Sequence, residues 1–129
     1  KFTVLKTQHL LIKGKINGVK GNFILDTGAS NSCVGFESVE HFKLDAQFSE
    51  TKAAGAGATG MDTQIAKNNN IKIGSWQNQE MHIVIFDMSH VNEALQNYKV
   101  KPVDGVLGAD ILIKGKAIID YCNCCLYLR

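Results

Sequence analysis

The residues of this chain with the clearest capacity for chemistry are five consecutive ones, Asp26, Thr27, Gly28, Ala29 and Ser30. They follow the apolar run Phe23 to Leu25, so the sequence predicts a carboxylate on a tight turn directly after a buried strand. Because Gly28 has no Cβ, a second loop can approach closely and a backbone N–H can point at the carboxylate. Ser30 is placed to direct a hydroxyl toward Asp26, and Thr27 to bond across to a partner loop.

A lone aspartate is a poor general base near neutral pH, so Asp26 makes chemical sense if a second carboxylate faces it. Two carboxyl groups a few ångström apart cannot both ionise, and they share one proton. The ionised member then activates a water, while the protonated member polarises or protonates the carbonyl group under attack. A pair of this kind supplies both the acid and the base. Taken alone, Asp-Thr-Gly is equally well read as an ordinary turn.

A second motif lies downstream, from Val103 to Leu112. The chain resembles the retropepsin-like aspartic proteases, particularly the bacterial type, over roughly Leu10 to Leu128. The resemblance lies in the order of three segments: Phe-Ile-Leu-Asp-Thr-Gly-Ala-Ser, a glycine-rich segment, and Val-Leu-Gly-Ala-Asp-Ile-Leu. The resemblance implies a catalytic Asp26 supported by Thr27, Gly28 and Ser30. It also implies that a short helix follows the second motif, and that the residues packed behind the catalytic loop are Val106, Leu107 and Gly108.

The number of catalytic motifs predicts the architecture. A pepsin-like enzyme has two Asp-Thr/Ser-Gly loops in two lobes, whereas this chain has one such loop in 129 residues, the length of one ordinary domain. We therefore expect a single domain over residues 1–129. The second aspartate must come from a second chain, and the resemblance implies a symmetric homodimer with the active site on its two-fold axis.

The elements that must position these residues are mostly short strands. We expect strands over 9–16 and 19–25 joined by an Asn17-Gly18 hairpin turn, and a strand over 32–34 leaving the catalytic loop. Further strands are expected over 71–73 and 81–86, with a turn at Gly74-Ser75, and in a closing hairpin over 117–121 and 125–128. Short helices are expected over 36–42 and 92–98. The predicted fold class is all-β, a closed retropepsin-like barrel with one to three short helices.

The segment from Ala54 to Gly60 is rich in glycine and has two interpretations. Its glycines match the dinucleotide-binding fingerprint, but that fingerprint requires a hydrophobic strand before it and an amphipathic helix after it, and both are missing. We favour a mobile hairpin tip, since the resembling family has a flap between its two motifs. A plain loop is the alternative. Substrate-binding residues are then expected to be Ala29, Asn31, Cys33, Gly57 and Ala58.

The four cysteines are Cys33, Cys122, Cys124 and Cys125. Cys-Asn-Cys-Cys is not a standard zinc spacing and no histidine pair accompanies it, so we expect free thiols and no metal. Cys33 matches a family position that lines a substrate pocket, and it equally fits a small buried hydrophobe. No Gly-x-Ser-x-Gly motif occurs, which leaves a serine hydrolase without support.

The composition fits a globular domain and limits the partners. A formal net charge of +2 with scattered basic residues gives no indication of nucleic acid, and no apolar run is long enough to span a bilayer. Lys1 rather than Met comes first, as expected after removal of a signal segment or from an engineered boundary. The first alternative implies an extracytoplasmic or periplasmic location.

The sequence thus predicts an aspartic endopeptidase, an acid protease acting on peptides or proteins as a homodimer without a metal or organic cofactor. The backbone near Gly28 and Asn31 is expected to hold an extended peptide by strand-like hydrogen bonds. The alternative is a catalytically silent dimerisation or peptide-binding module with the same fold. A third interpretation is a monomer in which the aspartate pair never assembles.

Overall fold

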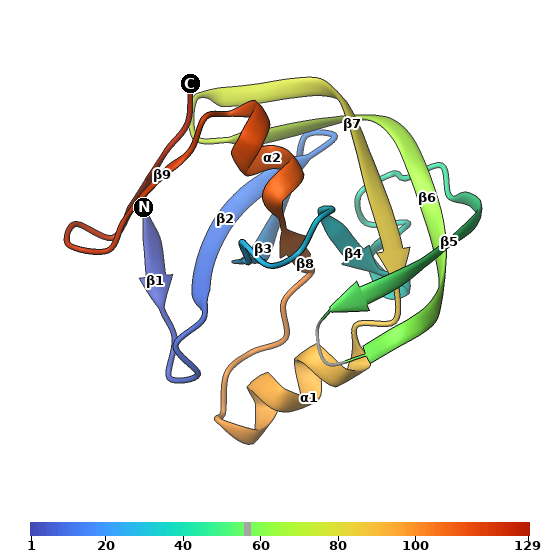
Figure 1. Ribbon diagram of the computed structural model, residues 1–129, viewed down its shortest axis with the longest axis horizontal. Coiled ribbons are helices and arrows are strands. Elements are labelled where there is room, and N and C mark those ends of the chain that lie inside the picture. The colour runs from blue at the N-terminus through green and yellow to red at the C-terminus, as the bar shows by residue number, and fades with distance from the viewer. Residues whose placement is uncertain (56–57) are drawn as a thin grey trace.

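A computed structural model describes the backbone of residues 1–55 and 58–129 and the side chains of residues 1–46 and 63–129 (Figure 1). The strands of this described part are β1 (Phe2–Val4), β2 (Leu10–Ile16), β3 (Val19–Leu25), β4 (Cys33–Gly35), β5 (Gln47–Gly55), β6 (Ala58–Ile73), β7 (Trp76–Phe86), β8 (Gly105–Leu107), β9 (Ile118–Asp120) and β10 (Cys125–Tyr127). Its helices are the 3-10 turn η1 (Phe36–Ser38), α1 (Ser89–Asn97) and α2 (Ala109–Lys114).

Six of these strands close into a barrel. Neighbouring strands follow the order β2, β3, β8, β4, β7, β6, and β6 pairs back to β2. The closing pairs are Lys15 with Lys72 and Ile16 with Ile71, and the Asn17 N–H extends the closure by donating to the Asn70 carbonyl at 2.8 Å. β1 adds to β2 and β5 adds to β6. The prediction of an all-β closed barrel with a few short helices is confirmed.

Two tight turns set the register of the long hairpins. Asn17 and Gly18 both have positive φ, 51° and 83°, and they join Ile16 to its partner Val19. These are the backbone angles that a two-residue hairpin turn needs, and Asn-Gly supplies them at little cost. Gly74, with φ of 59°, makes the turn between β6 and β7. Both predicted hairpin turns are confirmed.

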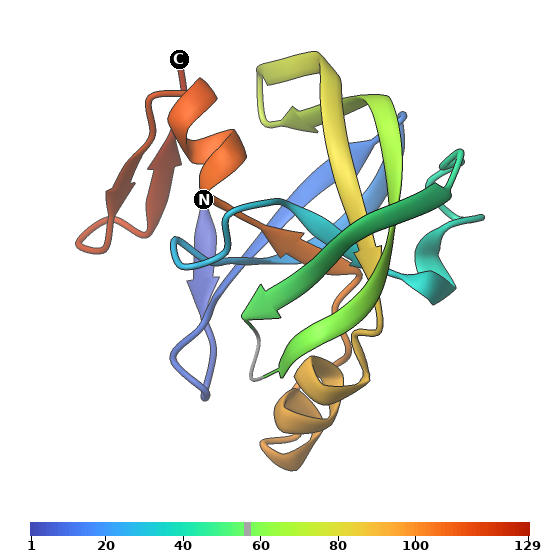
Figure 2. The ribbon, with the colours of Figure 1, turned by 45° about the vertical axis from the view of Figure 1, so that its right-hand side comes forward.

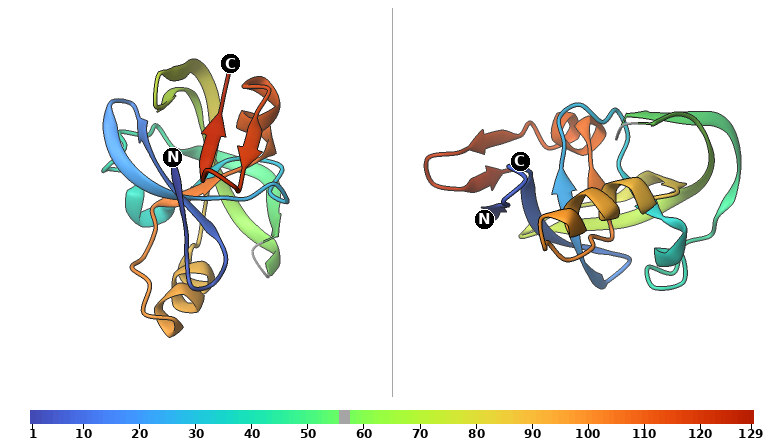
Figure 3. Two further views of the ribbon diagram at one scale, coloured as in Figure 1. Left: turned by 90° about the vertical axis from the view of Figure 1, so that its left-hand side faces the viewer. Right: turned by 90° about the horizontal axis from the view of Figure 1, so that it is seen from below.

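The strand that leads to Asp26 is buried on both faces. Phe23 and Leu25 belong to the core inside the barrel, while Ile24 belongs to a second apolar cluster with residues of α1, β7 and β8. Successive side chains of a strand point to opposite faces, so a strand between two apolar clusters must be apolar throughout. Figure 3 shows α1 outside the barrel, where it covers this second cluster.

Several predicted elements differ in extent from the observed ones. The helix expected over 36–42 is a 3-10 helix of three residues followed by turns, because Lys43 has a φ of 56° and the Phe42 ring turns inward to stack on Phe23. β6 begins at Ala58, well before the expected start at Ile71, since bulges accommodate its polar asparagines. The predicted helix over 92–98 begins earlier, at Ser89, and the closing C-terminal hairpin is confirmed.

Candidate active site

Asp26 is the first residue after β3, and the neighbouring strand fixes its backbone. Leu25 lies opposite Leu107 in the parallel pair β3–β8, and the Asp26 N–H donates to the Leu107 carbonyl at 2.9 Å. The side chain of Asp26 is half-buried. In Figures 1 and 2 the loop that follows it runs as a light-blue trace from β3 to β4 across one face of the barrel.

The carboxylate of Asp26 is held from within its own turn. The Gly28 N–H donates to its Oδ1 at 2.8 Å, and the Ala29 N–H donates to its main-chain carbonyl at 3.2 Å. A backbone N–H therefore points at the carboxylate, as the sequence predicts. Thr27 and Gly28 are exposed, so the tip of the turn is open to solvent in a single chain. Ser30 is also exposed and makes no hydrogen bond with Asp26 among the described residues.

A different serine anchors the loop. Ser32 is 2% exposed, and Asp110 of α2 accepts from it twice, from the Ser32 N–H at 2.8 Å and from its hydroxyl at 2.7 Å. The hydroxyl oxygen in turn accepts from the Gly108 N–H at 3.0 Å. Asp110 also accepts from the N–H of Ile111. A carboxylate that accepts several such hydrogen bonds is a strong and directional anchor, so α2 holds the loop in place.

Close backbone contact completes this anchor. The Ala109 N–H donates to the Ala29 carbonyl at 2.7 Å. A Cβ at Gly108 would lie 2.6 Å from that same carbonyl and 3.0 Å from the carbonyl of Asn31, so a side chain there would push the loop away. Val106 and Leu107 of β8 are buried next to β3. The segment of Val106, Leu107 and Gly108 therefore lies directly behind the turn that carries Asp26.

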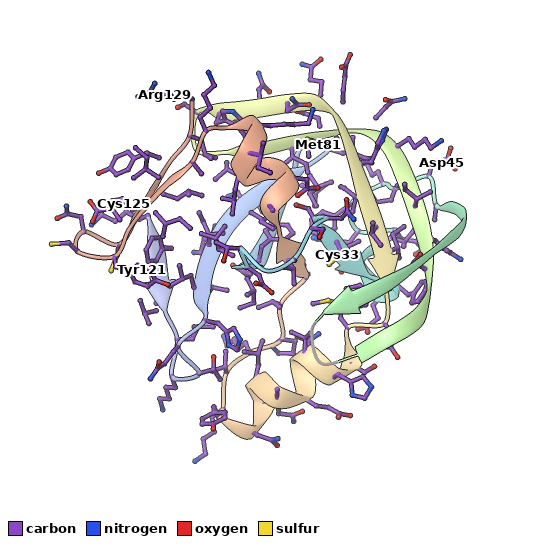
Figure 4. The ribbon with its side chains drawn as sticks, in the orientation of Figure 1. Cys33, Asp45, Met81, Tyr121, Cys125 and Arg129 are labelled. Carbon is purple, nitrogen blue, oxygen red and sulfur yellow. The ribbon has the colours of Figure 1, made fainter. Side chains whose placement is uncertain are left out.

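Cys33 begins the strand that leaves the loop. It lies opposite Val106 of β8 and Val84 of β7, and its side chain packs against the second apolar cluster (Figure 4). Burial, and then the nearby Asp110 carboxylate, raise the pKa of Cys33 from 9.0 to about 12. The thiol is thus protonated at physiological pH and behaves as a small apolar group rather than as a nucleophile.

The other predicted substrate-binding residues divide between the loop and the β5–β6 hairpin. Ala29 is half-buried and its carbonyl is already bonded to α2, whereas Asn31 is exposed. Gly55 pairs with Ala58, so the glycine-rich segment is part of a hairpin, as the sequence predicts. Gly57 and the side chain of Ala58 lie outside the described residues. The described end of the hairpin lies beside the Asp26 loop in both views of Figure 3.

Ser32 and Asp110 are the two residues of the site that the motif analysis missed. Asp110 stands within the second motif and Ser32 begins the strand expected over 32–34, but the argument from Asp26 assigned the supporting hydroxyl to Ser30. The available signals were a polar residue at the start of an apolar strand and an acidic residue in the first turn of the helix after Gly108. Neither signal pairs the two residues, because they lie far apart in the sequence.

The described residues include no cluster of three or more side chains suited to hold a metal ion. All four cysteines are free thiols, and three of them, Cys122, Cys124 and Cys125, belong to the C-terminal hairpin, where Figure 4 labels Cys125. No α-helix in the described part of the chain is long and apolar enough to cross a membrane.

The fold and the motifs identify the family. The profile of the aspartyl protease family matches residues 12–111, which include the Asp26 turn, Gly108 and Asp110. The chain belongs to the aspartyl protease family. No curated protein sequence matches the chain significantly.

Solved structures with the same fold are retropepsin-like. EIAV protease in complex with the inhibitor HBY-793 is 22% identical with a TM-score of 0.62, over 86% of this chain and 91% of that chain. A retropepsin-like aspartic protease from Rickettsia conorii is 19% identical with a TM-score of 0.65, over 92% and 82%. The retroviral protease-like domain of Ddi1 from Leishmania major is 16% identical with a TM-score of 0.61, over 93% and 87%. The chain therefore has a retropepsin-like fold.

Proposed function

We propose that the chain is an aspartic endopeptidase whose active site forms when two copies bring their Asp26 carboxylates together. The observation that carries this proposal is the contrast within the Asp26 turn. Its base is fixed by β8 and α2, while its tip, with Thr27 and Gly28, is exposed. The chain has a single Asp-Thr-Gly, so a second carboxylate of the same kind requires a second copy.

The chemistry of such a pair follows from the shared proton. The ionised Asp26 takes a proton from a water whose oxygen attacks the peptide carbonyl carbon, and the protonated Asp26 of the other copy donates its proton to the carbonyl oxygen. Collapse of the tetrahedral intermediate breaks the C–N bond, and the leaving nitrogen takes a proton from the pair. The Gly28 N–H supports this cycle because it holds one carboxylate oxygen of Asp26 in place.

Residues around the turn would hold the peptide in an extended form. Asn31 is exposed beside the turn, and Cys33 offers a neutral, mostly apolar surface. We assign the same role to Ala29 and to Gly57 and Ala58 of the β5–β6 hairpin, which would cover the peptide. Thr27 would bond to the loop of the other copy and brace the pair.

The surface beside the turn supports association with a second copy. Ile118 and Tyr127 lie opposite each other in the β9–β10 pair and are 56% and 51% exposed. Ile113 of α2 and Tyr121 of the same hairpin are also exposed apolar side chains. In Figure 2 the loop after β3, α2 and this hairpin lie along one edge of the molecule. Burying these side chains against a second copy would be favourable.

Mixing two forms of the chain tests the proposal. Natural chain at constant concentration is mixed with increasing Asp26→Asn chain, and cleavage of a peptide library is measured together with molecular mass. If each site needs both carboxylates, inactive mixed dimers form and activity falls as the variant is added. Glu93→Gln chain, changed at an exposed position of α1, serves as the matched control and leaves activity undiminished.

Two results would contradict the proposal. In the first, the protein stays monomeric and its activity depends only on the amount of natural chain, whatever amount of Asp26→Asn chain is added. The other is a dimer that binds peptides from the library without cleaving them at any pH, which would favour the catalytically silent binding module.

A further inference from the structure

A basic groove lies on the outer surface of the barrel, where the β2–β3 and β6–β7 hairpins turn. Its volume is about 550 Å³, and the lysines that line it are Lys13, Lys15, Lys20 and Lys72. Lys20 stands at the turn end of β3 and Asp26 follows the opposite end, about 20 Å away along the strand at some 3.3 Å per residue. The groove is therefore separate from the candidate active site.

Strand register brings three of these lysines into one row. Lys15 of β2 lies directly opposite Lys20 of β3 and directly opposite Lys72 of β6. Directly opposed residues have Cβ atoms roughly 5 Å apart, and like charges in this position destabilise a sheet. Lys13 follows on the same face of β2, two residues away. All four side chains are exposed, so the ammonium groups share one patch of surface.

The charge of this row is not compensated within the described part of the chain. None of the four lysines forms an ion pair with a described residue. Among the described residues that line the groove, Asp104 is the single carboxylate, and its Oδ2 already accepts from the Asn22 N–H at 2.8 Å. Four ammonium groups thus face one carboxylate, and an anion bound among them would relieve their repulsion.

The lining of the groove indicates what kind of anion fits. The remaining lining residues are Asn22 and the glycines Gly14, Gly21 and Gly74, so no aromatic or aliphatic side chain is present to stack a base or hold an apolar group. β2 is paired on both sides here, with β3 and β6, so a peptide cannot add to it as a strand. Ammonium groups on flexible stems suit phosphate oxygens, and several separated ammonium groups suit several linked phosphates.

We propose that this groove is a binding site for a compact polyanion that carries several phosphate groups, such as a linear oligophosphate. The site is independent of the proposed peptidase activity. The volume of the groove lies within the range of small-ligand pockets, roughly 300–1,000 Å³, which favours a small polyanion over a long polymer.

Calorimetric titration of the natural chain with inorganic tripolyphosphate tests the proposal. We expect one tripolyphosphate per chain, binding that weakens as salt is raised, and binding of orthophosphate at least tenfold weaker. Lys15→Gln, at the centre of the row, should weaken tripolyphosphate binding by up to about fivefold, since it removes the ammonium group that faces two others. Lys6→Gln makes the same change of charge outside the groove and should leave binding unchanged.

A second variant tests whether removing a negative charge from the groove strengthens anion binding. Asp104→Asn keeps an oxygen that can accept from the Asn22 N–H but removes the opposing negative charge. It should tighten tripolyphosphate binding. Thermal unfolding without ligand should also occur at a higher temperature in Lys15→Gln than in Lys6→Gln, because only the former relieves the repulsion within the row.

Several outcomes would overturn the proposal. These are no tripolyphosphate binding at low salt, an equal loss of affinity in Lys15→Gln and Lys6→Gln, or weaker binding by Asp104→Asn. Tighter binding of a short oligothymidine would show that the phosphates belong to a nucleic acid, and tighter binding of an oligoglutamate peptide would show that the groove recognises acidic protein segments. Either result would replace the proposed small polyanion.

Discussion

The loop that follows β3 and the hairpin of β9 and β10 lie on the same edge of the molecule but are built in opposite ways. The loop is anchored by polar contacts from α2 and β8, which reach Asp26, Ala29 and Ser32. The hairpin has one apolar face that packs on the core, with Ile119 and Leu126, and one that is exposed, with Ile118 and Tyr127. The first region is complete within one chain, while the second leaves apolar surface uncovered.

This difference separates positioning from assembly. Hydrogen bonds between buried groups fix direction, so they suit a loop that must hold a carboxylate in one orientation. Apolar contact is nearly non-directional and depends on the area that is buried, so it suits a surface that joins two chains. In the proposed dimer, each half of the active site would therefore be organised before the two copies meet. Substitutions in the two regions should accordingly have different effects.

The largest expected effect comes from Asp26→Asn. The amide keeps the shape of the carboxylate and its acceptor for the Gly28 N–H, but it cannot act as a base or share a proton. Peptide hydrolysis should fall by roughly 10²–10⁴-fold, while thermal unfolding and mass in solution stay close to those of the natural chain. Turnover that is unchanged in the purified variant would remove Asp26 from the mechanism.

The second largest effect should be a difference in the rate of thiol alkylation between Cys33, which follows the loop, and Cys122, on the hairpin. Because the pKa of Cys33 is raised from 9.0 to about 12, its thiolate fraction at about pH 8 is some 10³-fold below that of an ordinary cysteine. Iodoacetamide should therefore modify exposed Cys122 on the hairpin while Cys33 stays unmodified. In urea, burial is lost and Cys33 should react readily. Mass spectrometry of peptides measures both rates, and equal rates for Cys33 with and without urea would contradict the burial of this thiol.

Asp110→Ala should weaken the anchored region by a moderate amount. It leaves the buried Ser32 N–H without its acceptor, which costs about 1–3 kcal/mol of the free energy of unfolding, and it releases the loop from α2. The rate of peptide cleavage should also fall, even under conditions in which the variant remains folded, because the position of Asp26 depends on this loop. Urea denaturation and peptide cleavage measure the two effects, with Glu93→Ala on α1 as the control. Stability equal to that of Glu93→Ala would show that the loop does not depend on Asp110.

Ile118→Lys should have the smallest effect on the fold and act on assembly instead. Its side chain is mostly exposed in the single chain, so the free energy of unfolding of the monomer should change by no more than about 0.5 kcal/mol. A charge placed on the apolar face should raise the dissociation constant of the dimer, as measured by analytical ultracentrifugation. Glu93→Gln, at an exposed position of α1, provides a control outside this surface. An unchanged dissociation constant would place the contact between copies elsewhere.

The sequence was most informative where local chemistry decides structure. Asn17-Gly18 specified a hairpin turn because few other residue pairs adopt positive φ so readily, and the observed angles agree. The run Phe23 to Leu25 predicted a buried strand, and the structure shows that it is buried on both faces. The stretch from Phe36 to Phe42 was misread as a helix, because its apolar spacing reflects the inward turn of Phe42 rather than a helical face.

The sequence by itself determined the family and the turn that carries Asp26, because motifs and turn residues act locally, and the family resemblance carried the closed all-β fold with it. Only the tertiary structure decided which hydroxyl anchors that turn, since Ser32 meets Asp110 through the packing of α2 against the loop. It also gathered lysines that are scattered along the sequence into one row across β3, β2 and β6. Both results depend on strand register and helix packing, which bring together residues distant in the chain.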